Sequence, residues 1–129
     1  MFDRELTIET LGRIKGLLHE ILVWTEGINS PDDFTKSPTG MILLNAVCMK
    51  LLAVGEEVKS LDRRTRGELL PRYNSVPWKE VMGLRDVIAH HYFEVDAAEI
   101  LVVIQSDIQP LRETILQMMR EADDQAAKK

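Results

Sequence analysis

The chain has 129 residues, of which 45% are hydrophobic and 29% charged, and its formal net charge at pH 7 is −5. This length suits one domain with a single core, and the composition is that of a globular protein and not of a disordered or fibrous one. The negative net charge excludes a generally basic surface of the kind that coats nucleic acid.

No apolar run approaches the length of about 18 residues that would indicate a membrane span. Charged residues follow the first Met almost at once, which is not the pattern of a signal peptide. The single cysteine, Cys48, excludes an internal disulfide and is expected to be a small buried side chain. These features together favour a cytoplasmic protein without membrane contact.

Apolar residues at alternating steps of three and four predict a first amphipathic helix, which begins after an N-cap at Asp3 and runs to about Gly27. A Ser-Pro-Asp-Asp sequence at 30–33 is typical of the start of a short helix. A second Ser-Pro sequence at 37–40 is expected to break the chain again before the next long element.

A second long helix is predicted at about 41–61, where one face carries Leu44, Val47, Leu51, Val54, Val58 and Leu61. Gly55 lies within this helix, at a cost in helix propensity of up to about 1 kcal/mol. The residue therefore indicates that another helix packs closely against this point.

A third helix is predicted from Pro77 and Trp78 towards residue 90, and a fourth at about 97–121 with Asp96 as its N-cap. Pro110 is expected to kink or divide the fourth helix, and the polar residues 122–129 are expected to fray. The whole chain, 1–129, is thus predicted to be a single all-α domain, an up-and-down four-helix bundle with an additional short helix.

Basic residues concentrate between Lys59 and Arg85. Seven basic residues face three acidic ones in this window, a net charge of +4 that leaves −9 for the rest of the chain. Such a segment can steer a phosphate backbone towards the residues that follow it, although a solvated loop with charges compensated elsewhere has the same composition.

Residues 85–92, Arg-Asp-Val-Ile-Ala-His-His-Tyr, hold more reactive side chains than any other stretch. Arg85 presents a fork of donors that suits phosphate, and His90 and His91 can exchange protons near neutral pH. Tyr92 adds a hydroxyl group. The alternative interpretation is a helix end at which Arg and His bind carbonyl groups and Tyr packs.

The spacing of Arg85 and His90 constrains any shared site. On an ideal helix with 3.6 residues per turn, positions five apart point about 140° away from each other. Either the backbone departs from regular helix after Ala89, or the site is assembled from two chains. A metal site of His90, His91 and Glu94 is not favoured, because adjacent histidines diverge on a helix and no metal-binding motif accompanies them.

The R-x4-H-x-Y pattern of Arg85, His90 and Tyr92 resembles the signature of the HEPN superfamily in the form carried by HepT-like toxins. The likeness extends to flanking segments. Residues 51–58 resemble the family's helix with an Ile-Gly-Glu sequence, and 76–84 resemble its Pro-Trp run into the arginine. Residues 92–96 and 107–111 also fit, so that the resemblance covers about 4–120.

This resemblance implies a metal-independent endoribonuclease toxin that works as a homodimer on RNA, without a cofactor. His90 would move a proton at the ribose 2′-hydroxyl or the leaving oxygen, and Arg85 would bind the phosphate. Asp86 is expected to support catalysis by orienting the His90 imidazole, unless it is an ordinary exposed carboxylate. His91, at a variable position of the signature, would either assist or lie exposed.

The resemblance also implies a protein partner, a nucleotidyltransferase antitoxin that attaches AMP to the motif tyrosine, here Tyr92. The added negative charge would repel or displace RNA beside Arg85 and His90. A different function remains open on the sequence: a non-catalytic helical interaction or nucleotide-binding module that partners a nucleotidyltransferase.

Overall fold

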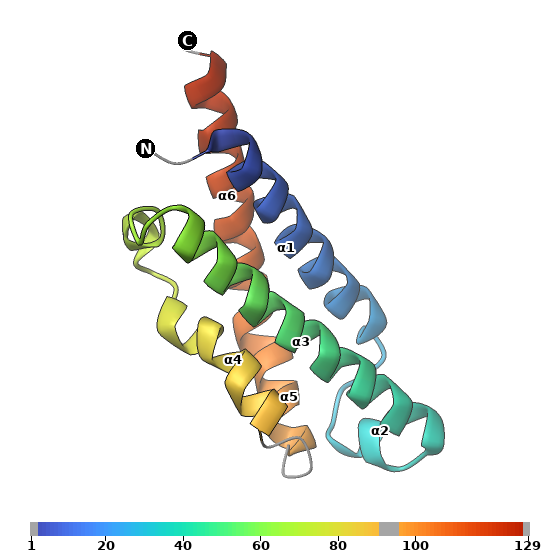
Figure 1. The fold of residues 1–129 in the computed structure, drawn as a ribbon. Coiled ribbons are helices and arrows are strands. Elements are labelled where there is room, and N and C mark those ends of the chain that lie inside the picture. The colour runs from blue at the N-terminus through green and yellow to red at the C-terminus, as the bar shows by residue number, and fades with distance from the viewer. Residues whose placement is uncertain (1–2, 91–95, 128–129) are drawn as a thin grey trace.

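A computed structural model describes residues 3–90 and 96–127, and every regular element in these ranges is helical, which confirms the all-α prediction. Figure 1 shows the elements along the chain. They are α1 (Arg4–Trp24), α2 (Asp32–Thr35), α3 (Pro38–Arg64), the 3-10 helix η1 (Leu70–Tyr73), α4 (Trp78–His90), α5 (Ala97–Val102), the π-helix η3 (Val103–Asp107) and α6 (Ile108–Ala127).

Helix α3 occupies the middle of the molecule, with α1 packed on one side of it and α4 on the other, while α6 packs against α1 (Figure 1). The start of α1 and the end of α6 lie at the same end of the molecule, where Arg4 Nε donates a hydrogen bond to the Ala122 carbonyl oxygen at 3.3 Å. The apolar stripes predicted from the sequence meet in one core. Its fully buried members include Leu11, Ile14, Leu18, Ile21, Val47, Leu51, Val54, Val58, Leu61 and Ile115.

Helix α1 begins as predicted, because the Asp3 side chain accepts a hydrogen bond from the Leu6 backbone N–H. It ends at Trp24, earlier than the predicted Gly27. The buried Thr25 hydroxyl donates to the Ile21 carbonyl oxygen at 2.7 Å, alongside the backbone N–H of the same threonine. These side-chain and backbone bonds at the helix end are local features that apolar periodicity does not contain.

Helix α3 begins at Pro38, and not at Met41 as predicted, so the expected chain break at 37–40 is in fact a helix start. The Ser37 hydroxyl accepts from the Gly40 N–H at 3.0 Å, and Pro38 occupies the first helical position. At its other end the helix extends to Arg64, beyond the predicted residue 61. The short helix predicted before it is present as α2.

Among the described residues, α3 is the one helix that is long and apolar enough to cross a membrane by length and composition alone. Its apolar residues have another explanation in this structure. Nine residues of α3, Cys48 among them, are buried, and the helix packs against both α1 and α4. The prediction that Cys48 is a buried side chain is confirmed, and burial raises the pKa of its thiol.

The fourth predicted helix is divided, but upstream of Pro110. Its backbone follows a π-helix through Val103–Asp107 and then continues as α6 to Ala127. Proline lacks an N–H and its ring crowds the carbonyl group four residues earlier, here that of Ser106. The wider turns of the π-helix therefore include Ser106, the residue whose carbonyl group the proline ring crowds. The residues after 121 contain neither Gly nor Pro, so the helix continues six residues beyond its predicted end.

Candidate functional site

Helix α4 carries the described part of the 85–92 motif and is fixed at its start by Trp78. This side chain is buried, and its indole N–H donates to the Tyr73 carbonyl oxygen at 2.9 Å. Ile88, near the other end, is buried in the core. The residues between these two anchors therefore have defined positions relative to α3.

Gly55 is the point of closest approach between α3 and α4, which confirms the contact predicted there. A Cβ atom on Gly55 would lie 2.9 Å from the Arg85 backbone nitrogen and 3.1 Å from the Val81 carbonyl oxygen. Backbone packs against backbone here, so that no other residue fits without a shift of the helices. Arg85 is thereby held directly beside the Gly55 turn of α3.

The Arg85 guanidinium forms two ion pairs, one with each neighbouring carboxylate. Its Nε lies 2.5 Å from Glu56 Oε1 on α3, and its Nη1 lies 3.1 Å from Asp86 Oδ1 on α4. The hydrogen bond to Asp86 is the largest cause that raises the pKa of this guanidinium, and the Glu56 carboxylate raises it as well. The Arg85 side chain remains 40% exposed, so solvent and a ligand can reach it.

Asp86 does not take the expected position beside His90. Its carboxylate accepts a hydrogen bond from Arg85 Nη1, and among the described residues no hydrogen bond joins it to the His90 imidazole. Arg85 lowers the pKa of the Asp86 carboxyl, and the more distant charges of Lys59 and His90 act in the same direction. The neighbouring arginine presents charged N–H donors directly to this carboxylate and so binds it.

His90 is the last residue of α4 and is exposed. Regular helix therefore continues past Ala89, so the angle of about 140° between Arg85 and His90 applies within one chain. Arg85 lies against α3, whereas His90 lies at the end of α4. Ion pairs bring Arg85, Asp86 and Glu56 together, whereas among the described residues no hydrogen bond joins His90 to them and His90 acts on Asp86 only through its charge.

The remaining motif residues, His91 and Tyr92, lie in the segment 91–95, outside the described residues. The metal site considered from the sequence also depends on His91 and Glu94 in that segment.

Glu56 is the functional candidate that reasoning from residue types missed. It follows Gly55 directly and pairs with Arg85, whereas its neighbour Glu57 pairs with Arg13 of α1 at 3.2 Å. The signal for Glu56 was its place immediately after a glycine that indicated a close helix contact.

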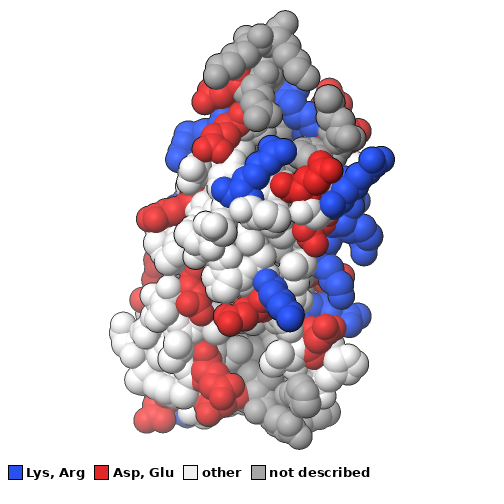
Figure 2. Space-filling model, turned by 90° about the vertical axis from the view of Figure 1, so that its left-hand side faces the viewer, with Lys and Arg blue, Asp and Glu red and all other residues white. Residues whose placement is uncertain are grey.

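Part of the basic segment lies near the start of α4, away from His90, whereas the charge of Lys59 acts on Asp86. Arg63 and Arg64 end α3, and Arg72 lies in η1, so these residues lie near the start of α4. Figure 2 shows several Lys and Arg along the right-hand edge of the face viewed and others over its upper and middle parts, with Asp and Glu among them.

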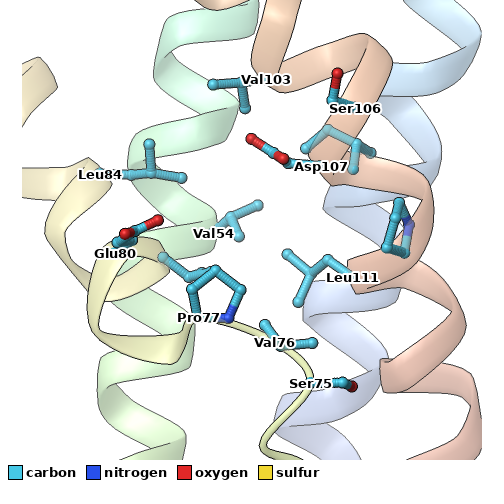
Figure 3. A pocket seen from close by; sticks show the side chains of 13 residues that line it. Val54, Ser75, Val76, Pro77, Glu80, Leu84, Val103, Ser106, Asp107 and Leu111 are labelled. Atoms are coloured by element: carbon cyan, nitrogen blue, oxygen red, sulfur yellow. The ribbon is translucent and has the colours of Figure 1, made fainter.

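A cavity of about 350 Å³ lies on another side of α4, where Val81 and Leu84 face η3 and α6. Figure 3 shows its mainly apolar walls and the Asp107 carboxylate turned into it, with Glu80 on the α4 side. Of the predicted site residues that the structure describes, Arg85, Asp86 and His90, none lines it. This cavity was not predicted from the sequence, because it depends on how the π-helix meets α4.

Comparison with family models matches residues 8–118 to the family described as Ribonuclease HepT-like. The chain is 34% identical over 116 residues to a gamma-glutamylcyclotransferase and putative RNase of Methanocaldococcus jannaschii, a match that covers 85% of this chain and 49% of that protein. The chain thus spans about half the length of this relative. It is 32% identical over 90 residues to a putative RNase of Caldanaerobacter subterraneus subsp. tengcongensis, with 70% of the chain and 74% of the relative covered. No solved structure matches the chain significantly.

Proposed function

This chain belongs to the HepT-like ribonuclease family, and on that premise we propose that it is a metal-independent endoribonuclease toxin in which Arg85 and His90 act on RNA. The observation that carries the proposal is the placement of Arg85. Its guanidinium is fixed by Glu56 and Asp86 and is still accessible, which is what phosphate binding requires. The test is cleavage of RNA by the purified protein in the presence of a chelator, with analysis of the product ends.

The chemistry uses the 2′-hydroxyl of the RNA as the nucleophile. This oxygen attacks the adjacent phosphorus and its proton passes to a base, while the bond from phosphorus to the 5′-oxygen breaks and that oxygen takes up a proton. The products end in a 2′,3′-cyclic phosphate and a 5′-hydroxyl. We assign proton transfer to His90, because an imidazole can give and take protons near neutral pH. We assign stabilisation of the developing negative charge on the phosphate to Arg85.

We propose that the complete site forms in a twofold homodimer of up-and-down four-helix bundles, each a single domain. The divergence of Arg85 and His90 on α4 supports this arrangement, because a partner chain can supply the group that one helix cannot bring to the same phosphate. Exposed apolar side chains also support it. Ile42, Met49 and Glu56 are seven residues apart on α3, so an exposed apolar stripe leads to the Arg85 ion pair.

Sedimentation at micromolar concentration is expected to show a dimer. Met49→Glu should shift the protein towards monomer and reduce RNA cleavage, because it places a charge on a side chain that is 60% exposed within the proposed interface. Val23→Glu is the control, since Val23 is also exposed but lies near the end of α1. A wild-type chain that sediments as a monomer and cleaves RNA would contradict the dimeric site.

Regulation by a nucleotidyltransferase antitoxin is proposed to act at Tyr92, two positions after His90. Transfer of AMP would form a bond between the tyrosine oxygen and the α-phosphorus of ATP and release pyrophosphate. The adduct brings a negative charge and a bulky nucleoside to the end of α4, where both oppose RNA binding. A catalytic role for Tyr92 as a base is disfavoured, because a phenol has an ordinary pKa of about 10.

Tyr92→Phe is therefore expected to retain most of the ribonuclease activity and to escape silencing by the cognate nucleotidyltransferase and ATP. Tyr73→Phe is the matched control, because the chain has two tyrosines and the Tyr73 hydroxyl instead binds Glu121. Mass spectrometry and a cleavage assay after incubation would measure both effects. AMP attached elsewhere, or equal silencing of Tyr92→Phe and the wild type, would contradict this assignment.

A further inference from the structure

The pairing of Arg85 with Glu56 occupies a particular edge of the guanidinium. Arginine has five N–H donors in a planar fork, and the Glu56 carboxylate forms an ion pair at Nε while Asp86 accepts a hydrogen bond from Nη1. Beyond these two contacts lie Nη2 and the second hydrogen of Nη1. The outer edge of the fork is formed by Nη1 and Nη2, of which Nη2 takes part in neither contact, and such an edge can bind two phosphate oxygens at once.

The contact with Glu56 depends on the way in which α3 and α4 cross. Because Gly55 has no side chain, the backbone of Arg85 on α4 occupies the space where a Cβ atom would lie. The next residue of α3, Glu56, can therefore reach the Nε atom of Arg85. Glu57, one position further, points to another helix and pairs with Arg13. Two adjacent carboxylates of the same type thus have separate partners, one in the candidate site and one outside it.

We propose that Glu56 is a positioning residue for the ribonuclease reaction, and this inference rests on the proposed function of Arg85. Glu56 holds the guanidinium by its Nε edge and directs the outer edge towards the scissile phosphate. It acts through Arg85 and does not contact RNA. A flexible arginine side chain would otherwise sample many orientations, and the productive one would be populated less often.

The charge of Glu56 separates this role from simple RNA binding. A carboxylate near a phosphate repels it, so removal of this negative charge should leave RNA binding unchanged or make it tighter. Loss of the fixed guanidinium orientation should instead slow the chemical step. The positioning role therefore predicts that removal of the Glu56 charge lowers kcat without raising KM.

The experiment compares Glu56→Gln, Glu56→Asp and the control Glu57→Gln in the full-length chain, with a short RNA oligonucleotide as the substrate. For Glu56→Gln we expect kcat to fall by about tenfold or more with KM equal to or below the wild-type value. Glu56→Asp keeps the charge and should recover part of kcat. Glu57→Gln should change neither constant more than about twofold, and circular dichroism melts should show all three variants folded.

A double-mutant cycle with Arg85→Ala makes the test specific. If Glu56 acts through Arg85, Glu56→Gln should have no further effect on the residual activity of Arg85→Ala. Wild-type kcat in Glu56→Gln, or an equal loss in both arms of the cycle, would overturn the positioning role. The failure of the proposed function has a different signature, full activity in Arg85→Ala itself, so the two hypotheses can be rejected separately.

Discussion

RNA cleavage is expected to fall by at least about a hundredfold in His90→Ala, because removal of a general acid–base group typically costs that much or more. Arg85→Ala should lose activity to a similar extent, since a single group that stabilises transition-state charge contributes a comparable factor. Cleavage by the wild type should persist with a chelator present. The measurement is single-turnover cleavage of a labelled RNA, with detection of the 2′,3′-cyclic phosphate end.

Each of these variants has a control of the same residue type elsewhere in the chain. His19 is exposed on α1, outside the buried stripe, and Arg13 pairs with Glu57. His19→Ala and Arg13→Ala should retain nearly full activity, because surface substitutions away from the site change little. Wild-type activity in His90→Ala would refute the assigned chemistry. Folded wild-type protein without any cleavage would instead favour the non-catalytic interaction module.

Mixing the two inactive variants tests whether the site is shared between chains. In a dimer with one motif residue from each chain, half of the molecules in an equal mixture pair an Arg85→Ala chain with a His90→Ala chain. Each such heterodimer holds one intact site, so about a quarter of the wild-type activity should return. A site formed within one chain would give no recovery.

The sequence predicted the helices and their buried faces because apolar periodicity records burial directly. It failed at the end of α1 and at both ends of α3, although the start of α1 at the Asp3 cap was correct. Helix α1 ends early at Trp24, and the Ser37 cap followed by Pro38 starts α3 where a break was expected. The π-helix and the cavity beside it were also unpredicted, since both depend on how a constraint from Pro110 is accommodated in three dimensions.

The candidate site was predicted only in part for a related reason. The residue types and spacing identified Arg85 and His90, but partners of charged side chains at a surface leave no periodic pattern. Asp86 was expected to orient His90 or to be an ordinary exposed carboxylate, and it binds Arg85. The different partners of Glu56 and Glu57 become known only from the packing of α3 against α4 and α1. Gly55 was informative because a glycine inside a helix has a cost that some contact must offset.

Gly55→Ala is expected to lower the free energy of unfolding by about 1–3 kcal/mol, even though alanine favours helix more than glycine does. The added Cβ would lie 2.9 Å from a backbone nitrogen of α4, so the two helices must move apart. Urea denaturation measures this change. Gly16→Ala in α1 is the control, because its Cβ would meet no atom within 4 Å, and it should be neutral or stabilising by up to about 1 kcal/mol.

The same substitution should reduce RNA cleavage by more than the loss of folded protein explains. Separation of α3 from α4 moves Glu56 away from the Arg85 guanidinium, whose ion pair depends on the close approach at Gly55. Activity is therefore measured at a temperature and urea concentration where the variant is fully folded. A Gly55→Ala chain with wild-type stability and wild-type kcat would show that the helices can adjust without cost, and that the contact at Gly55 does not set the position of Arg85.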